Sequence, residues 1–301
     1  YFRRFKAVLP ERSRGERKPI VIPFAVNEDD EVVSCSFENE LFAAYMMGAT
    51  RSGKSTLLHT IISGLIMNYH PDEVELWLLD FKMLEFKRYV DHRPPHVKYL
   101  LLEKSEDLVF DIIDQLERLL ADREHTFSKN GWKKLSDVPV SVYMPVIFVI
   151  IDEFAQMSQI MKETKGSGYG MDYTLKLANL LQKGAAMGFK FLFASQTYSD
   201  GVEGLTDPAR KQIQQRFALK NTYQEIKDVL DLSGDIPPSL QNHMNSLPPF
   251  ESLFKWRADD GSLRVDRLRN MYTEGDEVDR LVDMICEHMT VSSGGSSEDD
   301  R

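Results

Sequence analysis

The most constraining feature of this sequence is a glycine-rich octapeptide near residue 50. It reads Gly48-Ala49-Thr50-Arg51-Ser52-Gly53-Lys54-Ser55, which has the G-x-x-x-x-G-K-S spacing of a phosphate-binding P-loop. Glycines at both ends let the backbone curl until several N–H groups point at one anion. Lys54 adds a positive charge for the β- and γ-phosphates, and Ser55 offers a hydroxyl to Mg²⁺. We therefore expect ATP to bind at these eight residues and Thr56, with Lys54 also catalytic and Ser55 a metal ligand.

The segments on either side of this octapeptide have the required pattern. Residues 41–47 form a short apolar run that is typical of a buried strand. The residues that follow are spaced as on one face of a helix, namely Leu57, Leu58, Ile61, Ile62, Leu65 and Ile66. A chance match in a surface loop is the alternative interpretation, but a P-loop requires this order of strand, loop and helix.

A second informative stretch is a run of six apolar residues, 146–151, followed by Asp152 and Glu153. Such a run predicts a strand buried on both faces. We expect Asp152 to hold Mg²⁺, directly or through water, and Glu153 to act as the general base toward the attacking water. Another buried strand is expected at residues 189–196, and its terminal Gln196 is a candidate catalytic residue that senses the γ-phosphate.

The alternation of strands and helices predicts an α/β fold with a mostly parallel central sheet flanked by helices. Ligands bind at the carboxyl ends of the strands in such sheets, where the P-loop and both acids fall. Helices are expected at residues 107–128, 175–187, 223–231 and 276–289. Turn-forming residues 27–30 between two β-rich runs predict a small N-terminal β-hairpin.

Composition limits the classes of function. The 301 residues are 42% hydrophobic, which is enough for a core, and the formal net charge is −10. This charge argues against a uniformly basic surface for nucleic acid, although a locally basic pore is compatible with it. Cys35 and Cys286 lack metal-ligand spacing and are expected to be reduced thiols. Because no apolar run approaches the roughly 20 residues that span a bilayer, we expect a cytoplasmic chain. Attachment to the inner face of the cell membrane, through a portion outside this sequence, is the alternative.

Three regions are expected. Residues 1–38 would form a basic arm followed by the hairpin, residues 39–290 the ATPase domain, and residues 291–301 a disordered tail. The arm is interpreted either as a linker or as a contact for a nucleic-acid backbone or an acidic neighbour. Residues 162–170 are polar and glycine-rich, which predicts a mobile loop.

Six collinear segments resemble one family. Residues 47–55 are similar to its G-[AT]-T-G-S-G-K-S, with Arg51 in place of a glycine, and residues 78–85 to its L-I-D-P-K-M-L-E. The helix that contains Glu117 and Arg123 matches its E-M-x-x-R region, and residues 149–155, 181–196 and 215–220 match its later motifs. Over residues 40–232 the chain resembles the FtsK/SpoIIIE DNA translocases, RecA-like P-loop ATPases of the HerA/FtsK superfamily. It departs from them at residues 196–198, which are Gln-Thr-Tyr rather than Q-R-P, and no winged-helix module is recognisable.

The resemblance implies a hexameric ring that hydrolyses ATP and moves double-stranded DNA through its centre. It also implies an arginine that reaches the γ-phosphate from a neighbouring subunit, for which Arg216 is nominated, with Arg210 and Arg123 as rivals. Arg51 would face the phosphates or the subunit interface. Pore contacts would come from Lys82, Lys87 and Arg88 or from the loop at 162–170.

Two other functions stay open. FtsK/SpoIIIE-like domains also occur as ATPases of type VII protein secretion, and the acidic charge fits a polypeptide substrate. A degenerate ATPase that serves as a scaffold is disfavoured because Lys54, Ser55, Asp152 and Glu153 are all present.

Overall fold

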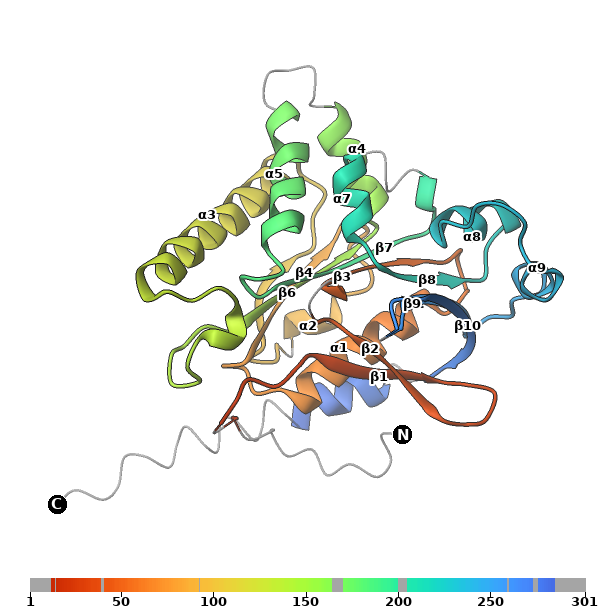
Figure 1. Ribbon diagram of the computed structural model, residues 1–301, viewed down its shortest axis with the longest axis horizontal. Helices are drawn as coiled ribbons and strands as arrows, with labels where there is room; N and C mark the ends of the chain where they lie inside the picture. Colours follow the sequence, from red (N-terminus) through yellow and green to blue (C-terminus); the bar gives the residue numbers. More distant parts are fainter. Residues whose placement is uncertain are drawn as a thin grey trace.

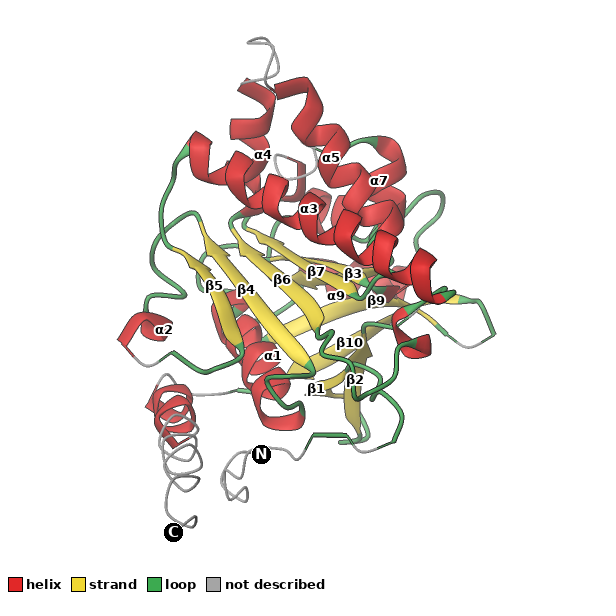
Figure 2. Ribbon diagram, turned by 90° about the vertical axis from the view of Figure 1, so that its left-hand side faces the viewer, coloured by secondary structure: helices red, strands yellow, loops and turns green. Residues whose placement is uncertain are grey.

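The chain folds around one ten-stranded sheet covered by helices on both faces (Figures 1 and 2). The computed structural model describes residues 12–13, 15–38, 41–91, 93–163, 170–199, 205–258, 260–272 and 276–284. The strand order is β2-β1-β10-β9-β8-β3-β7-β6-β4-β5. The prediction of an α/β fold with a mostly parallel sheet is therefore confirmed.

Six strands form the parallel part of the sheet. They are β3 (Ala43–Met47), β4 (Val74–Asp80), β5 (Val97–Leu101), β6 (Val146–Asp152), β7 (Phe189–Ser195) and β8 (Gln215–Leu219). In register, Met47 of β3 pairs with Ser195 of β7, and Asp80 of β4 pairs with Asp152 of β6. The carboxyl ends of these four strands therefore meet at one edge of the sheet, as the sequence predicted for the P-loop and the acids.

Four antiparallel strands extend the sheet beyond β8. They are β9 (Glu251–Arg257), β10 (Leu263–Asn270), β1 (Val21–Val26) and β2 (Val32–Ser36). The predicted N-terminal hairpin is β1–β2, and it continues the central sheet by pairing with β10. The β9–β10 hairpin was not predicted, because β10 carries charged residues at Arg264, Asp266 and Arg267. The boundary at residue 38 stays a prediction.

The helices fall on the two faces of this sheet, with α3, α4, α5 and α7 on one face and α1 on the other (Figure 2). Their bounds are α1 (Lys54–Asn68), α2 (Arg88–Asp91), α3 (Glu106–Asn130), α4 (Phe154–Glu163), α5 (Gly170–Lys183), α7 (Asp207–Gln212), α8 (Tyr223–Val229) and α9 (Pro238–Asn245). Among the described residues, no helix is long and apolar enough to cross a membrane.

Most predicted helices correspond to observed ones. The helix expected at 107–128 is α3, the one at 223–231 is α8, and the one at 175–187 begins earlier and ends earlier, as α5. Residues 276–284 are helical, whereas 285–289 lie outside the described residues, as does the tail at 291–301. Residues 164–169 of the predicted mobile loop also lie outside them. The prediction missed α2, α4, α7, α9 and β5, which are short or follow directly on a motif.

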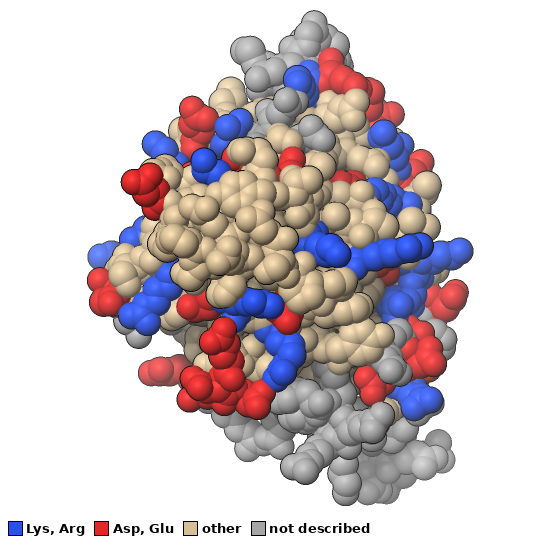
Figure 3. All heavy atoms as spheres, turned by 90° about the vertical axis from the view of Figure 1, so that its right-hand side faces the viewer, with Lys and Arg blue, Asp and Glu red and all other residues tan. Residues whose placement is uncertain are grey.

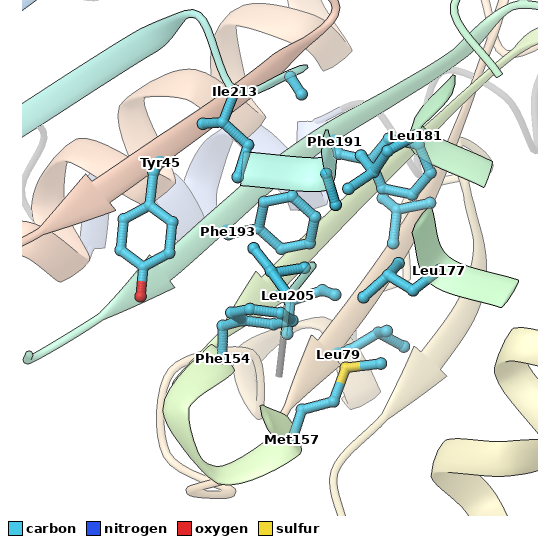
Figure 4. Packing of buried hydrophobic residues seen from close by; sticks show 14 of the residues in the cluster. Tyr45, Leu79, Phe154, Met157, Leu177, Leu181, Phe191, Phe193, Leu205 and Ile213 are labelled. Atoms are coloured by element: carbon cyan, nitrogen blue, oxygen red, sulfur yellow. The ribbon is translucent and has the colours of Figure 1, made fainter. Parts of the chain in front are cut away.

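The core lies on both faces of the parallel strands. Alternate residues of β6 face opposite sides, so that Val149 packs toward α3 and α5 while Phe148 packs toward α1. Figure 4 shows the first side, where Phe191 and Phe193 of β7 meet side chains from α4 and α5. The Phe193 ring lies 4.6 Å from that of Phe154, between centroids. Burial on both sides is the reason that these strands read as continuous apolar runs.

Arg123 fastens α3 to the opposite, amino-terminal edge of the sheet. Its Nη1 donates to the carbonyl of Met187 and its Nη2 to that of Pro145, each at 2.6 Å. The guanidinium also lies 5.1 Å from the centroid of the Phe189 ring. Burial lowers the pKa of Arg123 to about 10, so the side chain stays charged at neutral pH. Its planar fork joins the segments that precede β6 and β7.

Replacing Arg123 by methionine is expected to lower the free energy of unfolding by about 2–3 kcal/mol, because the buried Pro145 carbonyl and the partly buried Met187 carbonyl each lose a charged donor. Arg118→Met changes an exposed arginine of the same helix and is the control. Urea unfolding followed by circular dichroism measures both. Equal midpoints for the two variants would contradict this role for Arg123.

Two buried histidines are held neutral. The Nδ1 atom of His59, on α1, lies 2.9 Å from the Tyr89 hydroxyl, and the Nε2 atom of His96 lies 2.8 Å from the Tyr69 carbonyl oxygen. Burial lowers the pKa of His59 to about 3 and that of His96 to about 4. Both groups therefore bind a proton less readily in the folded chain than in the unfolded chain, whose histidines have a pKa of about 6.5.

We expect stability to fall as the pH drops from about 6.5 toward 4, because the unfolded state takes up these protons first. Urea unfolding at a series of pH values from 7.5 to 4.5 measures the slope. The variants His59→Gln and His96→Gln should each show a shallower loss in this window than the unmodified chain. An identical slope in all three proteins would show that neither histidine contributes.

Candidate nucleotide-binding site

The predicted P-loop connects β3 to α1 and is fastened to the ends of two neighbouring strands. The N–H of Gly48 donates to the Ser195 carbonyl at 3.2 Å, and the N–H of Ala49 donates to the Lys220 carbonyl at 3.0 Å. Gly48 also has no room for a side chain, because a Cβ there would lie 2.4 Å from Ser52 Oγ. These contacts fix the loop at the carboxyl edge of the sheet.

The loop then turns into the amino terminus of α1. Arg51 and Gly53 have φ angles of 65° and 98°, which is the left-handed conformation that lets the backbone curl. No side chain caps the first turn of α1, and that turn contains no acidic residue. Its first N–H groups, together with the positive end of the helix dipole, can therefore bind an anion. Ser55 and Thr56 are partly exposed in this turn.

The structure brings Lys54 and Asp152 into direct contact. The Lys54 ammonium forms an ion pair with the Asp152 carboxylate, and the two residues are only 7% and 1% exposed. Burial raises the pKa of Asp152 above its usual range, and the charge of Lys54 opposes that rise. The P-loop lysine and the acid at the end of β6, 98 residues apart, thus share one site.

Glu153 lies beside this pair with a left-handed φ of 56° and is 4% exposed. Its Oε1 atom accepts hydrogen bonds from the Ser195 hydroxyl at 3.1 Å and from the backbone N–H of Gln196 at 3.4 Å. Its carboxylate also forms an ion pair with Lys82. The predicted residues Glu153 and Gln196 are therefore neighbours, and the hydrogen bond between them comes from the Gln196 backbone rather than its side chain.

Asp80, at the end of β4, was not predicted as a site residue. This fully buried carboxylate accepts five backbone hydrogen bonds from the loop that follows it. The donors are Lys82 at 2.9 Å, Met83 at 2.9 Å, Leu84 at 2.9 Å, Glu85 at 2.7 Å and Phe86 at 3.1 Å. Asp80 thus folds this loop around itself. An acid that ends a buried strand beside the other acids was the available sequence signal.

Phe250 is a second residue that sequence reasoning missed. Its backbone N–H donates to the Ser52 carbonyl at 2.9 Å, and a Cβ added to Gly53 would lie 2.8 Å from its ring. Phe250 is 41% exposed, and its ring lies edge-on to that of Tyr272, with centroids 5.3 Å apart. No local pattern relates residue 250 to residue 53, so only the fold reveals this contact.

The three arginines nominated to act in trans differ in exposure. Arg216 is 7% exposed, and its Nη1 donates to the Tyr198 hydroxyl at 2.8 Å and to the Val229 carbonyl at 3.0 Å. Arg123 is bound to carbonyls of its own chain, as described above. Arg210 is more exposed and lies 3.6 Å from Asp207. These contacts favour structural roles for Arg216 and Arg123, and the arginine that acts in trans stays a prediction.

Basic side chains gather locally despite the negative net charge. Figure 3 shows them in a band on the side of the molecule where α8 and α9 lie in Figure 1. A cleft of about 740 Å³ near α8 has six basic lining residues, which are Arg210, Lys211, Arg216, Lys227, Lys255 and Arg257. Three acidic residues also line it: Asp207, Asp228 and Asp231. This imbalance would favour a polyanion or an acidic partner.

The residues at the edge of the sheet fit a magnesium ion held together with a phosphate. Magnesium in such sites takes one or two protein oxygens and completes its coordination with phosphates and water. The Asp152 carboxylate already faces a cation, Lys54, and the Ser55 hydroxyl lies in the next position of the chain. Within the described residues no group of three or more His, Cys, Asp or Glu side chains could hold a metal alone.

Gly53→Ala should destabilise the chain more than Gly131→Ala. Both glycines have a positive φ, so alanine costs about 1–2 kcal/mol at each. A Cβ meets nothing within 4 Å at Gly131 but meets Phe250 at Gly53, which adds about 1–3 kcal/mol of overpacking. Urea unfolding gives the difference. Equal losses would mean that Phe250 does not press on the P-loop.

Comparison with protein families gives a match to the model of the FtsK/SpoIIIE family over residues 8–143. DNA translocase SpoIIIE of Bacillus subtilis (strain 168) is 24% identical over 259 residues, which are 82% of this chain and 30% of that protein. DNA translocase FtsK of Treponema pallidum (strain Nichols) is 26% identical over 244 residues, 76% of this chain and 28% of that protein. The chain thus spans less than a third of these relatives. The matches confirm the predicted resemblance.

Solved structures share the fold. The cytoplasmic domain of the Thermomonospora curvata type VII secretion ATPase EccC has a TM-score of 0.69 at 19% identity, covering 95% of this chain and 33% of that one. The monomer form of the pCW3 conjugation coupling protein TcpA with ATPγS has a TM-score of 0.65 at 16% identity, covering 94% and 75%. At such low identities these likenesses show the fold alone.

Proposed function

We propose that this FtsK/SpoIIIE-family motor domain hydrolyses ATP and uses the energy to move double-stranded DNA. The observation that carries the proposal is the contact between Lys54 and Asp152. It joins a P-loop and a strand-terminal acid, the two features that a nucleoside triphosphate and its magnesium ion require. The uncapped start of α1 supplies the N–H groups that would bind the phosphates.

Each residue of the site has a role in this proposal. The P-loop, Gly48 to Thr56, binds the triphosphate, and Lys54 exchanges its partner Asp152 for phosphate oxygens. Ser55 and Asp152 would hold Mg²⁺, which when bound supplies positive charge for the phosphates. Glu153 accepts a proton from the attacking water. Gln196, fixed beside Glu153 through its backbone, would face the γ-phosphate.

The cargo is inferred from the relatives. Those found by sequence are named DNA translocases, and the basic cleft near α8 would suit phosphate backbones or a neighbouring subunit. The site would be completed in a homo-oligomer, proposed to be a hexamer, by an arginine from the adjacent subunit. Arg210 is the most accessible of the three nominees. We propose that this ATPase domain lies in the cytoplasm. It would be attached to the inner face of the cell membrane if a further portion of the protein provides a membrane anchor.

Export of a protein substrate is the second candidate. The similarity in fold to EccC, a type VII secretion ATPase, is compatible with it. That similarity extends to a conjugation coupling protein as well, so it does not favour one cargo. Because the relatives found by sequence are DNA translocases, DNA is the favoured cargo.

Duplex DNA is expected to stimulate ATP hydrolysis by this chain, and the stimulation should fall steeply as salt rises, because phosphate contacts release counterions. A coupled ATPase assay over a salt series, with and without linear duplex, measures it. Glu153→Gln should still bind nucleotide but hydrolyse it about 10²–10⁴-fold more slowly. Hydrolysis that is indifferent to DNA of every length and form, but responds to a helical export substrate, would reverse the order of the two candidates.

A further inference from the structure

The two acids at the end of β6 have separate lysine partners. Asp152 is paired with Lys54, which belongs to the P-loop, whereas Glu153 is paired with Lys82, which belongs to the loop after β4. The P-loop lysine, here Lys54, binds the β- and γ-phosphates in any P-loop enzyme. Lys82 has no role so far in the proposed hydrolysis. The sequence suggested Lys82 only as a pore contact for DNA, and in the structure its ammonium lies at the proposed catalytic base instead.

The pairing leaves Glu153 with little freedom. The Ser195 hydroxyl and the Gln196 N–H both donate to Oε1 of Glu153, and the Lys82 ammonium is the ion-pair partner of Oε2. Within the described residues Oε2 accepts no hydrogen bond, so its lone pairs are available for a donor such as a water molecule. Because Glu153 is only 4% exposed, losing the lysine would leave a buried negative charge without a cation, which is costly. The side chain would then be free to turn toward another partner.

The backbone of Lys82 is itself held in place. Asp80 accepts the N–H of Lys82 at 2.9 Å and those of the next four residues. Met83 adopts a left-handed φ of 59° in the resulting turn. The lysine therefore projects from a loop that is held by five backbone hydrogen bonds to Asp80. Its side chain is 26% exposed, enough to be reached by a small reagent.

We propose that Lys82 is a positioning residue that holds the Glu153 carboxylate in the orientation in which it accepts a proton from water. This inference rests on the proposed function in one respect, that Glu153 is the general base. Asp80 extends the arrangement, because it fixes the loop from which Lys82 reaches Glu153. Lys82 acts through Glu153 and contributes little to nucleotide affinity, in contrast to Lys54.

The kinetic test compares Lys82→Met, which keeps the length of the side chain and removes its charge, with Lys82→Arg and with Lys104→Met at an exposed lysine after β5. Without DNA, Lys82→Met should lower kcat about 10- to 100-fold, since misplacing a catalytic group by an ångström has such an effect. KM and the Kd for Mg-ATPγS should change less than twofold. Lys82→Arg should recover much of the rate, and Lys104→Met should match the unmodified chain.

A second measurement does not depend on turnover. In the nucleotide-free chain, brief acetylation followed by mass spectrometry gives the reactivity of each lysine amine. Glu153→Gln removes the negative partner, so Lys82 should react several-fold faster in that variant while Lys104 reacts at the same rate.

Two results would overturn the inference. One is an unchanged reactivity of Lys82 in Glu153→Gln, and the other is a Lys82→Met variant that loses nucleotide affinity while keeping kcat, which would make Lys82 a phosphate ligand. Both experiments are done without DNA. A chain whose hydrolysis ignores DNA would therefore refute the proposed cargo and leave this inference intact, whereas a chain without any turnover would refute the ATPase proposal itself.

Discussion

The site depends on the contact between a lysine and an acid that are 98 residues apart in the chain. Lys54 and Asp152 are almost fully buried, and each would be costly to bury alone. Their contact requires that β3 and β6 end at the same edge of the sheet, with β7 between them. A parallel sheet provides this arrangement, because its strands all run in one direction between helices that cover both faces.

Polar groups at this edge form a continuous set rather than isolated pairs. Asp80 folds the loop that carries Lys82, Lys82 pairs with Glu153, and Glu153 accepts from Ser195, whose carbonyl in turn binds the P-loop at Gly48. Replacing one of these residues should therefore weaken the contacts of the others, because hydrogen bonds in a buried polar network strengthen one another. Nucleotide binding at the P-loop and chemistry at Glu153 share this support.

Strong local patterns were predictable from the sequence. The octapeptide at Gly48 has one dominant structural context, and continuous apolar runs such as residues 146–151 identify strands buried on both faces. Five of the six parallel strands, α1, α3 and the N-terminal hairpin were expected for these reasons. The β9–β10 hairpin was not, because four of the eight residues of β10 are charged and no continuous apolar run marks that strand.

The sequence by itself determined that a phosphate-binding loop and a strand-terminal pair of acids belong to one α/β domain, because glycine spacing and apolar runs are local properties. Only the tertiary structure decided which side chains meet. In the folded chain Lys82 forms an ion pair with Glu153, and the Phe250 ring packs against Gly53. The Arg216 guanidinium donates to the Val229 carbonyl of the same chain. Such contacts join residues far apart in the sequence, and they depend on strand order and helix packing, which no short stretch of residues encodes.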